Sequence, residues 1–113
     1  MEVVTMVGER GIRLRADVPT TRRERARGLL GRDHLAPDSA LLLERTRSVH
    51  TIGMRFEIAV AFLDAGLRVL EVVRVPPGRV LLPRRGARHV LELEVDTPLR
   101  SGDLLRASSD RAT

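Results

Sequence analysis

The stretch Ser48–Asp64, with the sequence SVHTIGMRFEIAVAFLD, constrains the fold more than any other part of the chain. Between Glu57 and Leu63 both alternating sets of side chains are apolar, which predicts a strand covered on both faces. Polar side chains with a wide chemical range, among them His50 and Arg55, come shortly before that strand. We therefore expect a packed sheet with a polar cluster at its end, where a functional site could lie.

Short apolar runs separated by turn residues recur along the rest of the chain. Strands are expected over residues 2–7, 11–18, 40–43, 57–63, 67–75, 79–82, 89–95 and 103–107. The turn at 8–11 makes a hairpin of the first two strands, and the turn at 64–66 makes the clearest hairpin in the chain. This pattern predicts a mainly β (α+β) fold, a small antiparallel β barrel or rolled sheet with one short helix.

The single helix is expected over residues 22–30. Thr21 and Glu24 stand three residues apart, as in a capping box, where each side chain bonds the other's backbone N–H. Gly31 is placed to end the helix. Gly28 would then lie inside it, at a cost of about 1 kcal/mol relative to Ala.

Composition limits the class of protein. A chain of 113 residues with 42% hydrophobic side chains fits a single domain, 1–113, with residues 108–113 as a frayed tail. Because there is no cysteine, disulfides, thiolate catalysis and zinc–sulfur sites are excluded. No apolar run approaches the roughly 20 residues of a membrane span, and no signal peptide is evident. A cytoplasmic protein is expected, and its oligomeric state is left open.

Arginine supplies every Lys-or-Arg positive charge of the chain. All 20 basic residues are Arg, and the net charge is +5. Such a charge would attract nucleic acid in a salt-dependent way. Aromatic side chains, on which single strands stack, are almost absent. At most weak, non-specific nucleic-acid binding is expected.

Four residues are candidates for a ligand site. His50 and Arg55 belong to the polar cluster, Glu92 stands on the strand 89–95, and Arg85 lies in a basic turn. His50 could act as a general base if an orienting carboxylate and a nucleophile such as Thr51 or Ser48 lay beside it. The three histidines have no metal-ligand spacing, and no nucleotide-binding fingerprint occurs, so neither a metal nor a cofactor is expected.

An ordered set of segments resembles a known family. The segments are Arg27–Arg32 (RGLLGR), Ser48–Asp64, Val75–Pro77 (VPP), Val90–Leu93 (VLEL) and Ser101–Leu104 (SGDL). Together they resemble the bacterial and archaeal family called domain of unknown function 192, over about residues 10–107. The resemblance implies a compact β-rich domain and no settled activity.

The chain departs from the family pattern at three places. The family usually has Asp at the position of Ala59, often has Pro-Ala-Gly where this chain has 94–96, and commonly has Cys where Thr46 stands. Read through the family, Ala59→Asp should be tolerated with a loss below about 2 kcal/mol at pH 7, because Arg55, His50 or loop N–H groups could still supply donors.

Three functions follow from these observations. The first is a non-enzymatic domain that binds a small anionic or polar ligand at His50, Arg55 and Glu92, with Arg85 as an outlying member. The second is a hydrolase-like enzyme with His50 as general base. The third is an arginine-mediated module that contacts nucleic acid or protein. A pocket joining His50 to Glu92 would favour the first two.

Overall fold

A computed structural model describes residues 1–109 of the chain. The elements of this part are β1 (Glu2–Gly8), β2 (Arg13–Val18), α1 (Arg22–Arg27), β3 (Ser39–Leu43), β4 (Val49–His50), β5 (Ile58–Leu63), β6 (Val69–Val75), β7 (Val80–Leu81), β8 (His89–Leu93) and β9 (Leu105–Ser109). The mainly β prediction is confirmed. No helix in residues 1–109 is long and apolar enough to cross a membrane.

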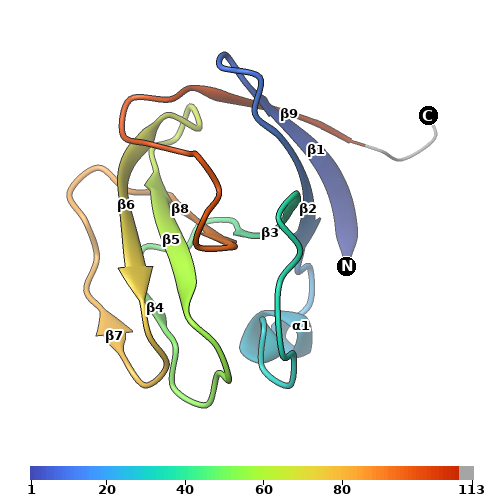
Figure 1. The fold of residues 1–113 in the computed structure, drawn as a ribbon, viewed down its shortest axis with the longest axis vertical. Coiled ribbons are helices and arrows are strands. Elements are labelled where there is room, and N and C mark those ends of the chain that lie inside the picture. The colour runs from blue at the N-terminus through green and yellow to red at the C-terminus, as the bar shows by residue number, and fades with distance from the viewer. Residues whose placement is uncertain (110–113) are drawn as a thin grey trace.

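Seven of the strands form one curled sheet, in the order β6-β5-β8-β3-β2-β1-β9 (Figure 1). The predicted hairpins β1–β2 and β5–β6 both form, with Met6 opposite Leu14 and Val60 opposite Val73. Neighbouring strands are antiparallel except β2 and β3, which run parallel. A chain that returns parallel to β2 needs a crossover, and α1 lies in that connection.

The curl nearly closes at one end, where the segment before β9 meets the start of β6. The Val69 N–H donates to the Asp103 carbonyl at 2.7 Å, and the Gly102 N–H donates to the Val69 carbonyl at 2.8 Å. Arg10, in the β1–β2 turn, donates to both carboxylate oxygens of Asp103. These hydrogen bonds hold the pKa of Asp103 down to about 2. The result is a half-barrel pinned at this end.

The core has two parts, one on each face of the sheet. Inside the curl, Leu14, Ala59, Ala61 and Leu91 pack together with side chains from the other strands. On the outer face lies a second cluster of Leu29, Leu35, Leu41, Leu43, Met54, Ile58, Val60, Phe62, Val75, Ala87 and Val90. Every residue of β5 is buried, so the prediction of a strand covered on both faces is confirmed.

The helix is shorter than predicted. Its capping box forms as expected, with the Glu24 N–H donating to Thr21 Oγ1 at 3.1 Å. It ends at Arg27 instead of Leu30, because Gly28 takes a positive φ of 49° and caps the helix by donating to the Glu24 carbonyl. Gly28 is therefore the C-terminal cap, and the predicted cap at Gly31 is wrong. The earlier stop turns Leu29 into the outer core.

Two further elements differ from expectation. β4 is a two-residue strand that pairs with β7, with Val49 opposite Leu81 and His50 opposite Val80. This small ribbon covers the outer face of the large sheet, since Val49 and Leu81 pack against the outer cluster. β9 includes Ser108 and Ser109, which were expected in the tail. The remainder of that tail lies outside the described residues.

Candidate functional site

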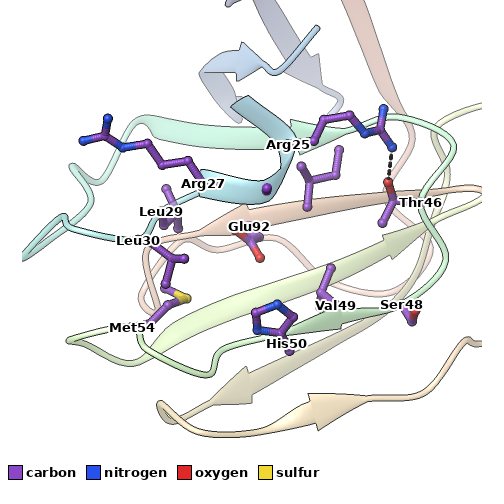
Figure 2. A pocket seen from close by; sticks show the side chains of 13 residues that line it. Arg25, Arg27, Leu29, Leu30, Thr46, Ser48, Val49, His50, Met54 and Glu92 are labelled. Atoms are coloured by element: carbon purple, nitrogen blue, oxygen red, sulfur yellow. Dashed lines mark hydrogen bonds between the residues drawn. The ribbon is translucent and has the colours of Figure 1, made fainter. Parts of the chain in front are cut away.

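A pocket of about 210 Å³ opens on the outer face of the sheet, between α1 and the β4–β7 ribbon (Figure 2). That volume is far above the roughly 10–15 Å³ that one water molecule requires. The pocket is lined by Arg25, Ala26, Arg27, Gly28, Leu29, Leu30, Leu43, Thr46, Ser48, Val49, His50, Met54 and Glu92. The walls are therefore mostly aliphatic, with one carboxyl group and a polar rim.

Glu92 is the polar side chain on the floor of this pocket. It projects from the middle of β8, between Leu41 on β3 and Val60 on β5, and only 4% of it is exposed. Within residues 1–109 no group hydrogen-bonds to its carboxyl, whose oxygen atoms are open to the pocket and not sealed in the core. Burial alone raises the pKa of Glu92 to about 7. Such a carboxyl is partly protonated at neutral pH, and no protein group in residues 1–109 uses its capacity to form hydrogen bonds.

The helix supplies one side of the rim. Arg25 Nη2 donates to the Glu44 carbonyl at 2.9 Å and to Thr46 Oγ1 at 2.8 Å, so the guanidinium is held in one place (Figure 2). Arg27 also lines the pocket, but its guanidinium extends away from the centre. One fixed cation therefore stands beside the aliphatic wall.

The ribbon supplies the opposite side through Ser48, Val49 and His50. The imidazole of His50 stands at the pocket across from the helix (Figure 2). In the described part of the chain it has no hydrogen bond to Ser48, Thr51 or Glu92. His50 thus borders the pocket without the oriented base–nucleophile pair that hydrolysis would use.

Thr51, a candidate nucleophile, has a structural role. Its hydroxyl is fully buried, donates to the Pro76 carbonyl at 2.7 Å and accepts from the Arg79 N–H at 2.9 Å. Both bonds tie the end of β4 to the turn before β7. Because the hydroxyl donates one structural hydrogen bond and accepts another, it is not free to act as a nucleophile with His50 as its base.

The model of the family DUF192, described as "Uncharacterized ACR, COG1430", matches residues 3–102. The chain belongs to this family. A UPF0127 protein from Pyrococcus horikoshii is 38% identical over 45 residues, which cover 40% of this chain and 39% of that protein.

Two crystal structures share the fold of this DUF192 member. A putative transcription regulator from Sinorhizobium meliloti 1021 aligns with a TM-score of 0.76 and 23% identity, over 94% of this chain and 92% of that one. A protein of unknown function from Novosphingobium aromaticivorans aligns with a TM-score of 0.77 and 21% identity, over 92% and 83%. At these identities the likeness concerns the fold.

The four residues singled out from the sequence fall into two groups. His50 and Glu92 line the same pocket. Arg55 is exposed beyond it and donates to Asp33 at 2.9 Å. Arg85 is exposed in the β7–β8 connection and is not among the lining residues. The arginines that line the pocket are Arg25 and Arg27, and hydrogen bonds to Glu44 and Thr46 hold Arg25 in place.

Sequence reasoning missed Arg25 because α1 carries several arginines. In the predicted helix over residues 22–30, Arg25 precedes Leu29 by four residues, the spacing that puts two side chains on one helix face, and this was the available signal. Thr46 was noted only as a family position, yet it holds the guanidinium of Arg25. Met54, which also belongs to the stretch Ser48–Asp64, lines the pocket as a buried side chain.

Other polar positions have simpler explanations. His89 accepts a hydrogen bond from the Arg45 N–H at 3.0 Å, as befits a satisfied strand residue. Ala59 faces the inside of the curl, away from Glu92, among apolar neighbours. The expectation that Arg55 or His50 could serve an Asp at this position is therefore wrong. Across residues 1–109, no three acidic or histidine side chains come together to hold a metal ion.

Proposed function

We propose that this DUF192 member binds a small polar or anionic ligand in the pocket between α1 and β4, without catalysis. The proposal rests mainly on Glu92, a carboxyl that is 4% exposed and has no hydrogen-bonding partner in residues 1–109. Buried carboxyls are normally paired, because burial without a partner costs free energy. A buried group with a perturbed pKa that opens into a cavity is typical of functional sites.

The surroundings of Glu92 support a binding site for a small molecule. Leu29, Leu43 and Val49 provide apolar contact area, while Arg25 and His50 provide polar contacts at the rim. Ligand pockets commonly combine apolar walls with a few placed polar groups. Binding is favoured over hydrolysis because the Thr51 hydroxyl is engaged elsewhere and His50 has no hydrogen-bonded nucleophile in the described chain.

The proposal is tested by screening a library of small polar compounds by NMR with methyl-labelled protein. We expect hits to shift the methyl signals of Leu29, Leu43 and Val49, and Glu92→Gln to weaken those hits. Glu9→Gln, which removes an exposed carboxylate far from the pocket lining, is the matched control. If hits map elsewhere on the surface, the pocket is not the ligand site. If hits in the pocket bind Glu92→Gln and wild type equally, the Glu92 carboxyl does not bind the ligand and the main support of the proposal is lost.

A second candidate function concerns a different surface. Arg13 and Arg15 on β2 and Arg106 on β9 are exposed on the outer face of the sheet, and Val7 of β1 lies between Arg13 and Arg106. None of the three has an ion pair in residues 1–109. They could contact a phosphate backbone weakly and without sequence preference.

For this second candidate, replacing all three arginines by Gln should flatten the salt dependence of duplex binding. Submicromolar, sequence-specific binding at physiological salt would contradict the expectation of weak, non-specific contact.

A further inference from the structure

We infer that the ligand is a small aliphatic zwitterion, whose ammonium group reaches Glu92 while its anionic group reaches Arg25. This inference rests on the proposed function and narrows it to one chemical class. It follows from three features of the pocket: the kind of group on its floor, the fixed cation on its rim and the aliphatic walls between them.

The floor of the pocket favours a cationic group. A Gln side chain, which has the same shape as Glu92, could hydrogen-bond a ligand hydroxyl without placing a charge among apolar side chains. A carboxyl there costs stability when it ionises, since the neighbouring strands offer only apolar side chains such as Leu41 and Val60. A ligand group of opposite charge stabilises that ionised state most, because it compensates the buried charge as well as donating a hydrogen bond.

The rim favours an anionic group. Arg25 is held by Glu44 and Thr46 through one nitrogen, Nη2. Its Nε and Nη1 groups make no hydrogen bond within residues 1–109 and remain available for a carboxylate. Because the guanidinium is already oriented, little side-chain entropy is lost when it binds an anion.

The walls favour an aliphatic chain between the two charged groups. The lining contains Leu29, Leu30, Leu43, Val49 and Met54 but no aromatic side chain. Nucleic-acid bases are commonly held by stacking on aromatic rings, and this pocket offers none. Glu92 and Arg25 stand on different elements, β8 and α1, so a single ligand that contacts both has to extend along the pocket wall between them (Figure 2).

Other titratable groups line the same pocket as Glu92 and would influence binding. α1 contributes Arg25 and Arg27, and β4 contributes His50, while β3 and β5 contribute none. A purely cationic ligand would be repelled by the arginines, and a purely anionic one by ionised Glu92. A zwitterion avoids both penalties.

The test uses ω-amino acids from glycine to aminohexanoate as probes, with calorimetry on the full chain. Each amino acid is compared with three analogues of equal chain length. The hydroxy acid and the simple carboxylic acid lack the ammonium group, and the amine lacks the carboxylate. We expect the best amino acid to bind at least about tenfold more tightly than each analogue. Glu92→Gln and Arg25→Gln should each weaken it at least about tenfold, whereas Arg23→Gln, on the exposed part of the same helix, should not.

The pH dependence separates Glu92 from His50. Affinity of the wild type should rise about tenfold from pH 6 to pH 8 as Glu92 ionises. His50→Gln should keep this rise, and Glu92→Gln should lose it. NMR spectra confirm that each variant is folded, and if Glu92→Gln does not fold, Arg25→Gln and the analogue series decide the question.

Two kinds of failure are distinguishable. If a hydroxy acid, amine or acid binds the pocket as tightly as the amino acid, the zwitterion inference is wrong while the proposed function stands. If neither the probes nor the screened compounds bind at the pocket, both the inference and the proposed function are wrong.

Discussion

Replacing Glu92 by Gln should change how the stability of the protein depends on pH. Glu92 is buried to 4% exposure on a central strand and has no partner in the described chain. Its pKa is raised by burial from 4.5 to about 7. Since the unfolded chain exposes this group to water, the folded state holds a proton that the unfolded state releases between these two pH values.

The sign and size follow from that difference. Below about pH 4.5 Glu92 is protonated in both states and costs nothing through ionisation. As the pH rises to about 7 the folded state retains the proton more tightly, so stability falls, and above pH 7 the loss is complete. Each pKa unit corresponds to about 1.4 kcal/mol, and the total is about 3 kcal/mol.

The assay is urea unfolding of wild type and Glu92→Gln from pH 4 to pH 9. We expect the stability of Glu92→Gln relative to wild type to increase by about 3 kcal/mol from pH 4 to pH 8. Burying the Gln amide has a free-energy cost that does not depend on pH. It therefore shifts the stability difference between Glu92→Gln and wild type by the same amount at every pH. Glu9→Gln gives the baseline for losing an exposed carboxylate. A difference that stays constant within about 0.5 kcal/mol would refute the unpartnered, buried state of Glu92.

Four further substitutions test the fold. Thr21→Ala should cost about 1 kcal/mol in urea unfolding, because its hydroxyl accepts the Glu24 N–H, and an unchanged midpoint would refute the cap. Phe62→Ala should cost about 3–5 kcal/mol, as the ring is fully buried beneath the Arg84 guanidinium, and a loss below about 1 kcal/mol would contradict this packing. Thr51→Val should cost about 1–2 kcal/mol by removing the part-buried hydrogen bonds of the Thr51 hydroxyl with the Pro76 carbonyl and the Arg79 N–H, and a neutral effect in thermal unfolding would be contrary evidence. Ala59→Asp should cost about 4 kcal/mol or more at pH 7 and less at pH 4, and tolerance below about 2 kcal/mol would reveal donors inside the curl.

The elements of this fold were predictable where local patterns are strong. β5 is apolar on both alternating sets, and the structure buries both its faces. The capping box at Thr21 marks the start of α1 correctly. The end of α1 was harder, because Gly28 and Gly31 both suit a helix terminus and only the packing of Leu29 decides between them.

The long-range arrangement was not predictable from the same patterns. The parallel pairing of β2 with β3 and the pairing of β4 with β7 join segments far apart in sequence. No residue pattern encodes such a register when one strand is only two residues long. For the same reason sequence reasoning could name His50 and Glu92 as candidates without establishing that they share a pocket.

The arginines of the candidate site show this limit most clearly. Arg55 is adjacent to the polar cluster in sequence, but the turn before β5 directs it to Asp33 at the surface. Arg25 lies 25 residues before His50 and reaches the pocket only because the fold places the end of α1 and β4 on two sides of one pocket. Side-chain direction at a loop depends on tertiary packing, which local sequence does not specify.

A crystal structure of the protein with the tightest-binding compound from the screen tests the central claim most directly. We expect the ligand between α1 and β4, with a nitrogen or oxygen atom at hydrogen-bonding distance, roughly 2.6–3.2 Å, from the Glu92 carboxyl. A ligand bound at any other surface, or one that leaves Glu92 without a polar contact, would contradict the claim that this buried carboxyl exists to bind a ligand.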